Sequence, residues 1–206
     1  MVTRCDRIDN PGRENAMNPR QSVHEDMRRD AEEAYRDHQI AGAGDQHWFI
    51  RRTRDSAYWG EIAVLRGAHI VIVGDGPKLI VRGGEDFAHD PMAHLQWFAE
   101  GGAEYIAGKV VGDGGFTWDE GVATAMLNNM ISDAQRADDG DQARDLREFR
   151  EALCESADEH VWAELLSDDF GDLGFTPDTF GRVIAVDVFM AQAAVRRLLH
   201  LLREQG

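Results

Sequence analysis

Large apolar side chains are unevenly distributed along the chain. Up to residue 45 they are few and charged side chains are many, so this segment cannot bury much surface. We expect residues 1–45 to form a polar tail that is partly disordered or holds one helix within 21–39. Dense apolar runs begin at residue 46. The folded part of the chain is therefore expected to start there.

Four short apolar runs between residues 46 and 84 predict an antiparallel β-meander. Two to four residues that include Gly, Asp or Ser separate them, as in β-hairpins. Apolar positions alternate, so that Trp48 and Ile50 share one face while Trp59 lies on the face opposite Ile62. Because both faces carry apolar residues, we expect helices to cover one side. The expected strands are His47–Thr53, Ala57–Arg66, His69–Val73 and Lys78–Arg82.

The apolar period becomes helical after residue 84. Asp90 followed by Pro91 is typical of a helix start, and residues 183–195 are apolar on nearly every side. We therefore predict an α+β fold in which the four-stranded antiparallel meander (46–84) precedes a helical bundle (85–206) with a central C-terminal helix. The other expected helix starts are a capping box at Thr117–Glu120, Asp141, a second capping box at Ser156–Glu159, and Thr176-Pro177, which opens a helix to about Arg203.

Charge narrows the classes of function. The chain has 38 acidic and 22 basic residues, a net charge of −16, and residues 113–172 hold 17 of the acidic but only four of the basic ones. Nucleic-acid binding needs lysine and arginine to displace counterions, and an anionic membrane attracts the same residues. We therefore expect neither direct nucleic-acid binding nor membrane binding. The acidic block itself becomes the main candidate surface.

The cysteine content and the lengths of the apolar runs limit the possible cellular locations of the protein. Two cysteines are too few for a disulfide scaffold, and no apolar run is long enough for a membrane span or a signal peptide. We expect a soluble protein of the host cytoplasm that needs no cofactor. Met17 and Met27 are alternative candidate starts of a shorter product, and the order of residues 1–45 on binding is left open.

Carboxylates in the acidic block recur at spacings of three and four residues. On a helix this spacing places them about 5–6 Å apart on one face, comparable to the phosphate spacing of a nucleic-acid strand. Such a face attracts a basic groove. An ordinary solvated face, partly neutralised by Arg144, Arg147 and Arg150, is the open alternative. The candidate partner-binding residues are Asp138, Asp139, Asp141, Asp145, Glu148 and Glu155, with Trp59 and Trp118 as aromatic anchors.

Chemistry-bearing residues elsewhere are sparse. His89 and His94 lie near Glu85 and Asp86, which suggests a metal-assisted enzyme, although the two histidines lack the spacing of a helical zinc pair. Asp187 lies within the apolar C-terminal stretch, where an ionised carboxylate needs a partner or solvent. Cys154 is more simply a small buried side chain than a nucleophile.

Two stretches that overlap the expected strands are Tyr58-Trp-Gly-Glu-Ile-Ala-Val64 and His69-Ile-Val-Ile-Val-Gly-Asp75. Together these stretches resemble small acidic accessory proteins of phages and prophages. That class includes inhibitors of host defence of the anti-CRISPR type, several of which mimic nucleic acid. The resemblance implies an inhibitor whose partner is a host protein or ribonucleoprotein complex with a basic groove. The alternatives are the metal-assisted enzyme and a structural module whose edge strands pair with a second copy in a homodimer.

Overall fold

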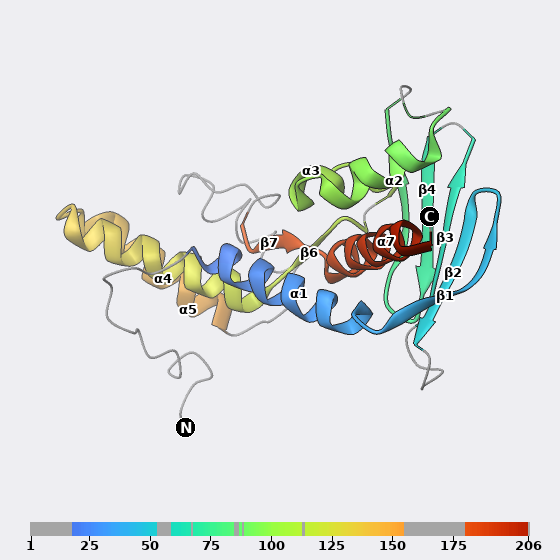
Figure 1. Cartoon of the computed structure of the whole chain (residues 1–206). Coiled ribbons are helices and arrows are strands. Elements are labelled where there is room, and N and C mark those ends of the chain that lie inside the picture. The colour runs from blue at the N-terminus through green and yellow to red at the C-terminus, as the bar shows by residue number, and fades with distance from the viewer. Residues whose placement is uncertain are drawn as a thin grey trace. The chain divides into compact units, whose positions relative to one another are not determined.

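The computed structural model describes residues 18–52, 59–66, 68–84, 87, 89–112, 114–154 and 180–205 (Figure 1). The fold is α+β, as predicted. The chain forms two compact units. Unit 1 comprises Met1–Val23 and Trp118–Val183, and unit 2 comprises His24–Thr117 and Ile184–Gly206. Among the described helices, none combines the length and apolarity that crossing a bilayer requires.

Unit 2 contains an antiparallel sheet of five strands, one more than predicted. The four predicted strands are present, and the additional strand β1 comes from a stretch that the sequence assigned to the polar tail. This stretch is rich in Gly and Ala, so it gives no alternating apolar signal, and its pairing with β2 supplies its order. In chain order, which is also the spatial order, the strands are β1 (His38–Gly44), β2 (His47–Arg52), β3 (Trp59–Leu65), β4 (His69–Gly74) and β5 (Lys78–Arg82).

Strand register places alternate side chains in the core, as the sequence pattern predicts. Ile50 lies opposite Gly60, and Trp48 opposite Ile62, all on the buried face. Ile62 in turn faces Ile72 in β4, which faces Leu79 in β5. The inward face is therefore a continuous apolar layer across the strands.

The two edges of the sheet differ. Arg82 donates its backbone N–H to the Lys109 carbonyl at 3.0 Å, and Val111 donates to the Ile80 carbonyl at 2.8 Å. An isolated bridge between Val81 and Val110 completes this short pairing along β5. At the opposite edge, β1 carries a bulge between Ile40 and Gly42. A bulge of this kind disrupts an edge as a template for further strands.

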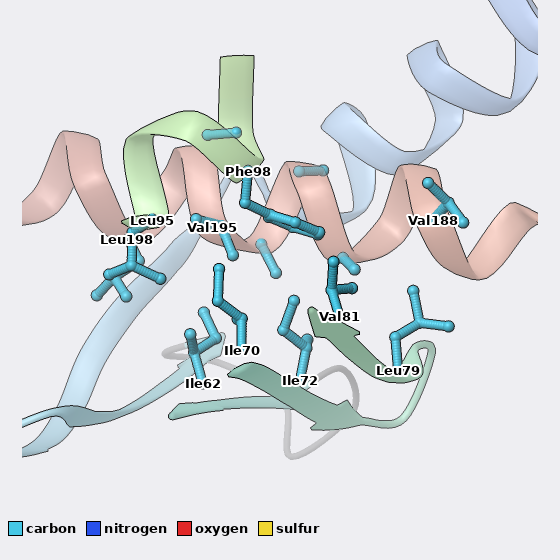
Figure 2. Packing of buried hydrophobic residues seen from close by; sticks show 14 of the residues in the cluster. Ile62, Ile70, Ile72, Leu79, Val81, Leu95, Phe98, Val188, Val195 and Leu198 are labelled. Carbon is cyan, nitrogen blue, oxygen red and sulfur yellow. The ribbon is translucent and has the colours of Figure 1, made fainter. Parts of the chain in front are cut away.

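Helices cover the inward face of the sheet, as expected. Figure 2 shows Leu95 and Phe98 of α2 (Pro91–Glu100) with Val195 of α7 facing the isoleucines of β3 and β4. α7 (Val186–Gln205) packs against β1, β2 and β5 as well as α2 and the short helix α3 (Ala103–Ala107). The apolar pattern of residues 183–195 predicted this helix at the centre of a helical bundle. It packs on a sheet instead, since an apolar helix surface fits either partner.

Helix starts were predicted with mixed success. Asp90 caps α2 as expected, because its side chain accepts a hydrogen bond from the Ala93 N–H at 2.9 Å. The capping box at Thr117–Glu120 is wrong: Thr117 lies in strand β6 (Phe116–Trp118), and Asp119 caps α4 (Glu120–Arg136) through the Val122 N–H. The polar helix expected within 21–39 is α1 (Pro19–Tyr35).

The predicted long C-terminal helix begins later than expected. Strand β7 (Arg182–Ile184) pairs with β6 inside its predicted range, and α7 starts only at Val186. Backbone pairing with β6 outweighs the helical pattern of these apolar residues. The predicted starts at Ser156–Glu159 and Thr176-Pro177 lie outside the described residues.

Candidate interaction surface

Unit 1 presents the described candidate carboxylates in the turn after α4 (Glu120–Arg136) and on the helix that follows it, α5 (Gly140–Cys154). α4 and α5 pack through a small apolar core that includes Leu127, Leu146 and Phe149. Ala143, Leu146 and Phe149 recur at intervals of three residues and fix which side of α5 is buried. Polar positions between them therefore face outward. This packing, rather than any site chemistry, sets the direction of the acidic side chains.

The turn between α4 and α5 uses two of the candidate aspartates structurally. Asp138 has a positive φ of 58°, a conformation that Asp and Asn tolerate better than most residues. The Asp139 carboxylate accepts a hydrogen bond from the Gln142 N–H at 3.0 Å and so caps α5. Both residues remain exposed. Their carboxylates therefore serve the turn and still contribute negative charge to the surface.

Three further candidates surround one guanidinium. Arg144 lies 3.1 Å from the Asp141 carboxylate, 3.3 Å from Asp145 and 4.0 Å from Glu148. The hydrogen bond to Asp145, and then the charges of Asp141 and Asp145, raise the pKa of Arg144 above its usual value. All four side chains are between 46% and 86% exposed. Solvent screening keeps such pairs weak, so a partner's cations can replace Arg144 at little cost.

The charge left after this pairing is still negative. Residues 133–151 contain seven carboxylates and four guanidiniums. Arg136 lies 3.4 Å from Asp133, and Arg150 turns away to donate to the Asn128 side chain at 3.2 Å. The predicted acidic face is thus present over α4 and α5, with a smaller excess than the sequence block as a whole. Glu155 and the acidic residues that follow it lie outside the described residues.

The two aromatic candidates occupy different settings. Trp59 lies on the outward face of the sheet, half-buried, with its ring centroid 6.0 Å from that of Phe49. Trp118 packs against the apolar core shared by α4 and α5, and its indole lies where a side chain at Gly181 would otherwise be. Trp59 is therefore partly accessible on the outward face of the sheet, while Trp118 has a packing role in unit 1.

The histidine cluster is not assembled as a metal site in the described part of the chain. His89 is exposed, but His94 is completely buried and stacks on Phe87 at 5.3 Å, with Trp97 at 5.4 Å from its ring. Burial, and then the charge of His69, lower the pKa of His94. No group of three potential metal ligands occurs among the described residues. Glu85 and Asp86 lie outside them.

The remaining single residues have ordinary surroundings. Asp187 is partly exposed in the first turn of α7, where a carboxylate interacts favourably with the helix dipole. Cys154 ends α5, and its side chain lies outside the described residues.

The structure also gathers residues that the sequence analysis did not select. Arg51, Lys78 and Arg82 lie at outward positions of β2 and β5, on the same face as Trp59. The signal in the sequence was that these residues alternate with buried neighbours.

A search against family models, a search of curated proteins and a search of solved structures each gave no match to the chain.

Proposed function

We propose that this protein is a phage-type inhibitor, of the anti-CRISPR kind, that binds a host defence complex which handles nucleic acid. Its acidic surface, formed by the α4–α5 turn and by α5, occupies a basic groove of that complex and excludes DNA or RNA. The observation that supports the proposal is the outward display of Asp138, Asp139, Asp141 and Glu148 along one helical hairpin. On α5, Asp141, Asp145 and Glu148 recur every three to four residues, a spacing that approximates that of strand phosphates.

The proposed mechanism is an exchange of ionic partners. Lysines and arginines of the groove replace Arg144 at Asp141 and Glu148, and they add contacts to the unpaired charge near the turn. Because these pairs are solvent-exposed at the start, little desolvation opposes the exchange. Long-range attraction between opposite fields accelerates the encounter and makes it sensitive to ionic strength.

The test uses a variant that preserves the turn. Asp138→Asn and Asp139→Asn keep the left-handed residue and the helix cap, while Asp141→Lys and Glu148→Lys reverse charges on the exposed face. The control variant carries Asp26→Lys, Asp30→Lys and Glu33→Lys on α1. It changes the net charge by the same amount at exposed helical carboxylates that also form surface pairs.

The assay is displacement of labelled nucleic acid from the partner complex after its isolation with the immobilised chain. The native chain and the α1 control displace the nucleic acid, whereas the α4–α5 variant loses at least tenfold in potency. Raising the salt concentration weakens the native chain but changes the variant little. Equal potency of all three proteins rules out the acidic surface as the binding site.

A further inference from the structure

The outward face of the sheet in unit 2 carries a second set of apolar side chains. Register aligns Phe49, Glu61, Val73 and Lys78 in one row across β2 to β5, and His47, Ala63, Val71 and Ile80 in the next. These side chains point away from α2 and α7, which pack on the buried face. We define the outer sheet face by its apolar members: Phe49, Trp59, Ala63, Leu65, Val71, Val73 and Ile80.

The outer sheet face exposes several large apolar side chains to solvent. Leu65 is 50% exposed, Ile80 45% and Val73 36%, although all three lie within regular strands. Isolated exposed leucines are normal in proteins, but a contiguous patch built from adjacent strands marks an interaction site. Phe49 and Trp59 flank it with their rings 6.0 Å apart.

The charge around this patch is opposite to that of the chain. Glu61 is the one carboxylate in all five strands, and its side-chain oxygen lies 2.6 Å from Nε2 of His47. Arg51, Lys78 and Arg82 lie at outward positions along the rim, each exposed and without an ion pair among the described residues. The acidic residues in the described turns beside these strands, Asp37, Asp45 and Asp75, lie outside the strands themselves. A protein of net charge −16 thus keeps a cationic rim around one apolar face.

We infer that the outer sheet face binds an acidic amphipathic helix of a partner protein, with an apolar stripe against the patch and carboxylates against Arg51, Lys78 and Arg82. An apolar centre inside a charged rim is the usual anatomy of an interface, and complementary charge sets the sign of the partner's rim. The four strands β2 to β5, spaced about 4.8 Å apart, span roughly 14 Å, the length of about 10 helical residues. A helix also fits a pleated face, as α7 does on the other side.

Charge also favours an acidic helix over two other possible occupants, a second copy of this chain and a single-stranded nucleic acid. In a dimer joined through this face, each copy would bring its own cationic rim, and like charges across an interface are unfavourable. Single-stranded nucleic acid binds through stacking on exposed aromatic rings. Here aliphatic side chains occupy the centre, and the two aromatic rings contact each other.

The experiment measures fluorescence anisotropy of labelled probes with the full chain. The first probe is a 14-residue helical peptide with leucines at i, i+3, i+4 and i+7 flanked by glutamates, the second has lysines in place of the glutamates, and the third is an oligo(dT) strand. The native chain binds the glutamate peptide at least tenfold more tightly than either other probe. Equal or tighter binding of the lysine peptide or of oligo(dT) overturns the inference, and this comparison needs no variant.

Variants then locate the site. Lys78→Glu with Arg82→Glu reverses two of the three rim cations, and Val73→Thr with Ile80→Thr removes exposed apolar groups while keeping strand-forming residues. Each pair lowers the affinity for the glutamate peptide at least tenfold. Met92→Thr is the matched control, since Met92 is 43% exposed on α2, and it leaves the affinity unchanged. Native affinity in both sheet variants, or dimerisation of the native chain that blocks the peptide, contradicts the inference.

Discussion

Substitution of Gln192 tests how α2 and α7 are joined. Gln192 is 1% exposed, and its amide nitrogen donates to the Phe98 and Gly101 carbonyls, each at 2.9 Å. One turn later Arg196 donates to the Ala99 carbonyl at 2.9 Å. The last carbonyls of a helix have no partner within it. Side chains of α7 therefore complete the C-terminal end of α2.

Gln192→Leu removes both amide hydrogen bonds and leaves two acceptors without their donor. A net hydrogen bond contributes about 1 kcal/mol, and a buried group left unsatisfied costs roughly 1–3 kcal/mol. Burial of the added leucine surface offsets part of the loss, at about 25 cal/mol per Å². We therefore expect the free energy of unfolding of unit 2 to fall by about 2–4 kcal/mol.

Amide hydrogen exchange of α7 as a function of urea measures this change in unit 2 alone, whatever the stability of unit 1. The matched control is Gln96→Leu. Gln96 lies exposed on α2 and donates only to the Glu100 carboxylate at 2.9 Å, so its loss costs no more than about 0.5 kcal/mol. If Gln192→Leu is as mild as the control, the carbonyls at the end of α2 do not depend on α7.

Three further substitutions test particular surroundings. The Tyr35 hydroxyl is buried without a hydrogen-bond partner in the described part of the chain. Tyr35→Phe therefore leaves the free energy of unfolding unchanged or raises it by about 1 kcal/mol. A loss of stability in a urea titration would show that the hydroxyl has a partner. Burial lowers the pKa of His94 below its ordinary 6.5, so the unfolded chain binds a proton more readily than the folded chain does. The free energy of unfolding therefore declines as the pH falls below about 6.5, by at most about 1.4 kcal/mol per pH unit. His94→Phe flattens this decline in urea midpoints measured from pH 7.5 to 5, and an unchanged slope assigns it elsewhere. Asp139→Ala destabilises unit 1 by about 1 kcal/mol through loss of the cap, while Asp139→Asn does not; equal thermal midpoints contradict the cap.

The strands of the sheet were predictable because each of four is a short apolar run between turn residues. Trp48 and Ile50 face inward, and Trp59 faces outward, as parity requires. β1 was not predictable in this way, since its Gly and Ala residues depend on β2 for order. The packing of α7 on the sheet could not be predicted from the sequence either. An apolar helix surface is the same whether a helix or a sheet packs against it.

The acidic surface was predictable as a set of outward positions but not as a set of contacts. Helical spacing places Asp141, Asp145 and Glu148 within reach of Arg144, so pairing of this kind was an open alternative. Which guanidinium engages carboxylates depends on tertiary structure. Arg150 pairs instead with Asn128, 22 residues earlier on α4. Identification of the outer sheet face also required the strand register, because its rim combines residues from strands that are distant in sequence.

The most direct test of the proposed function is carbodiimide labelling of carboxylates in the isolated complex, compared with the free chain by mass spectrometry. The account predicts that Asp138, Asp141 and Glu148 lose reactivity when the partner is bound, while Asp26 and Asp30 on α1 remain as reactive as before. Unchanged labelling of the three α4–α5 carboxylates in a fully formed complex would contradict it.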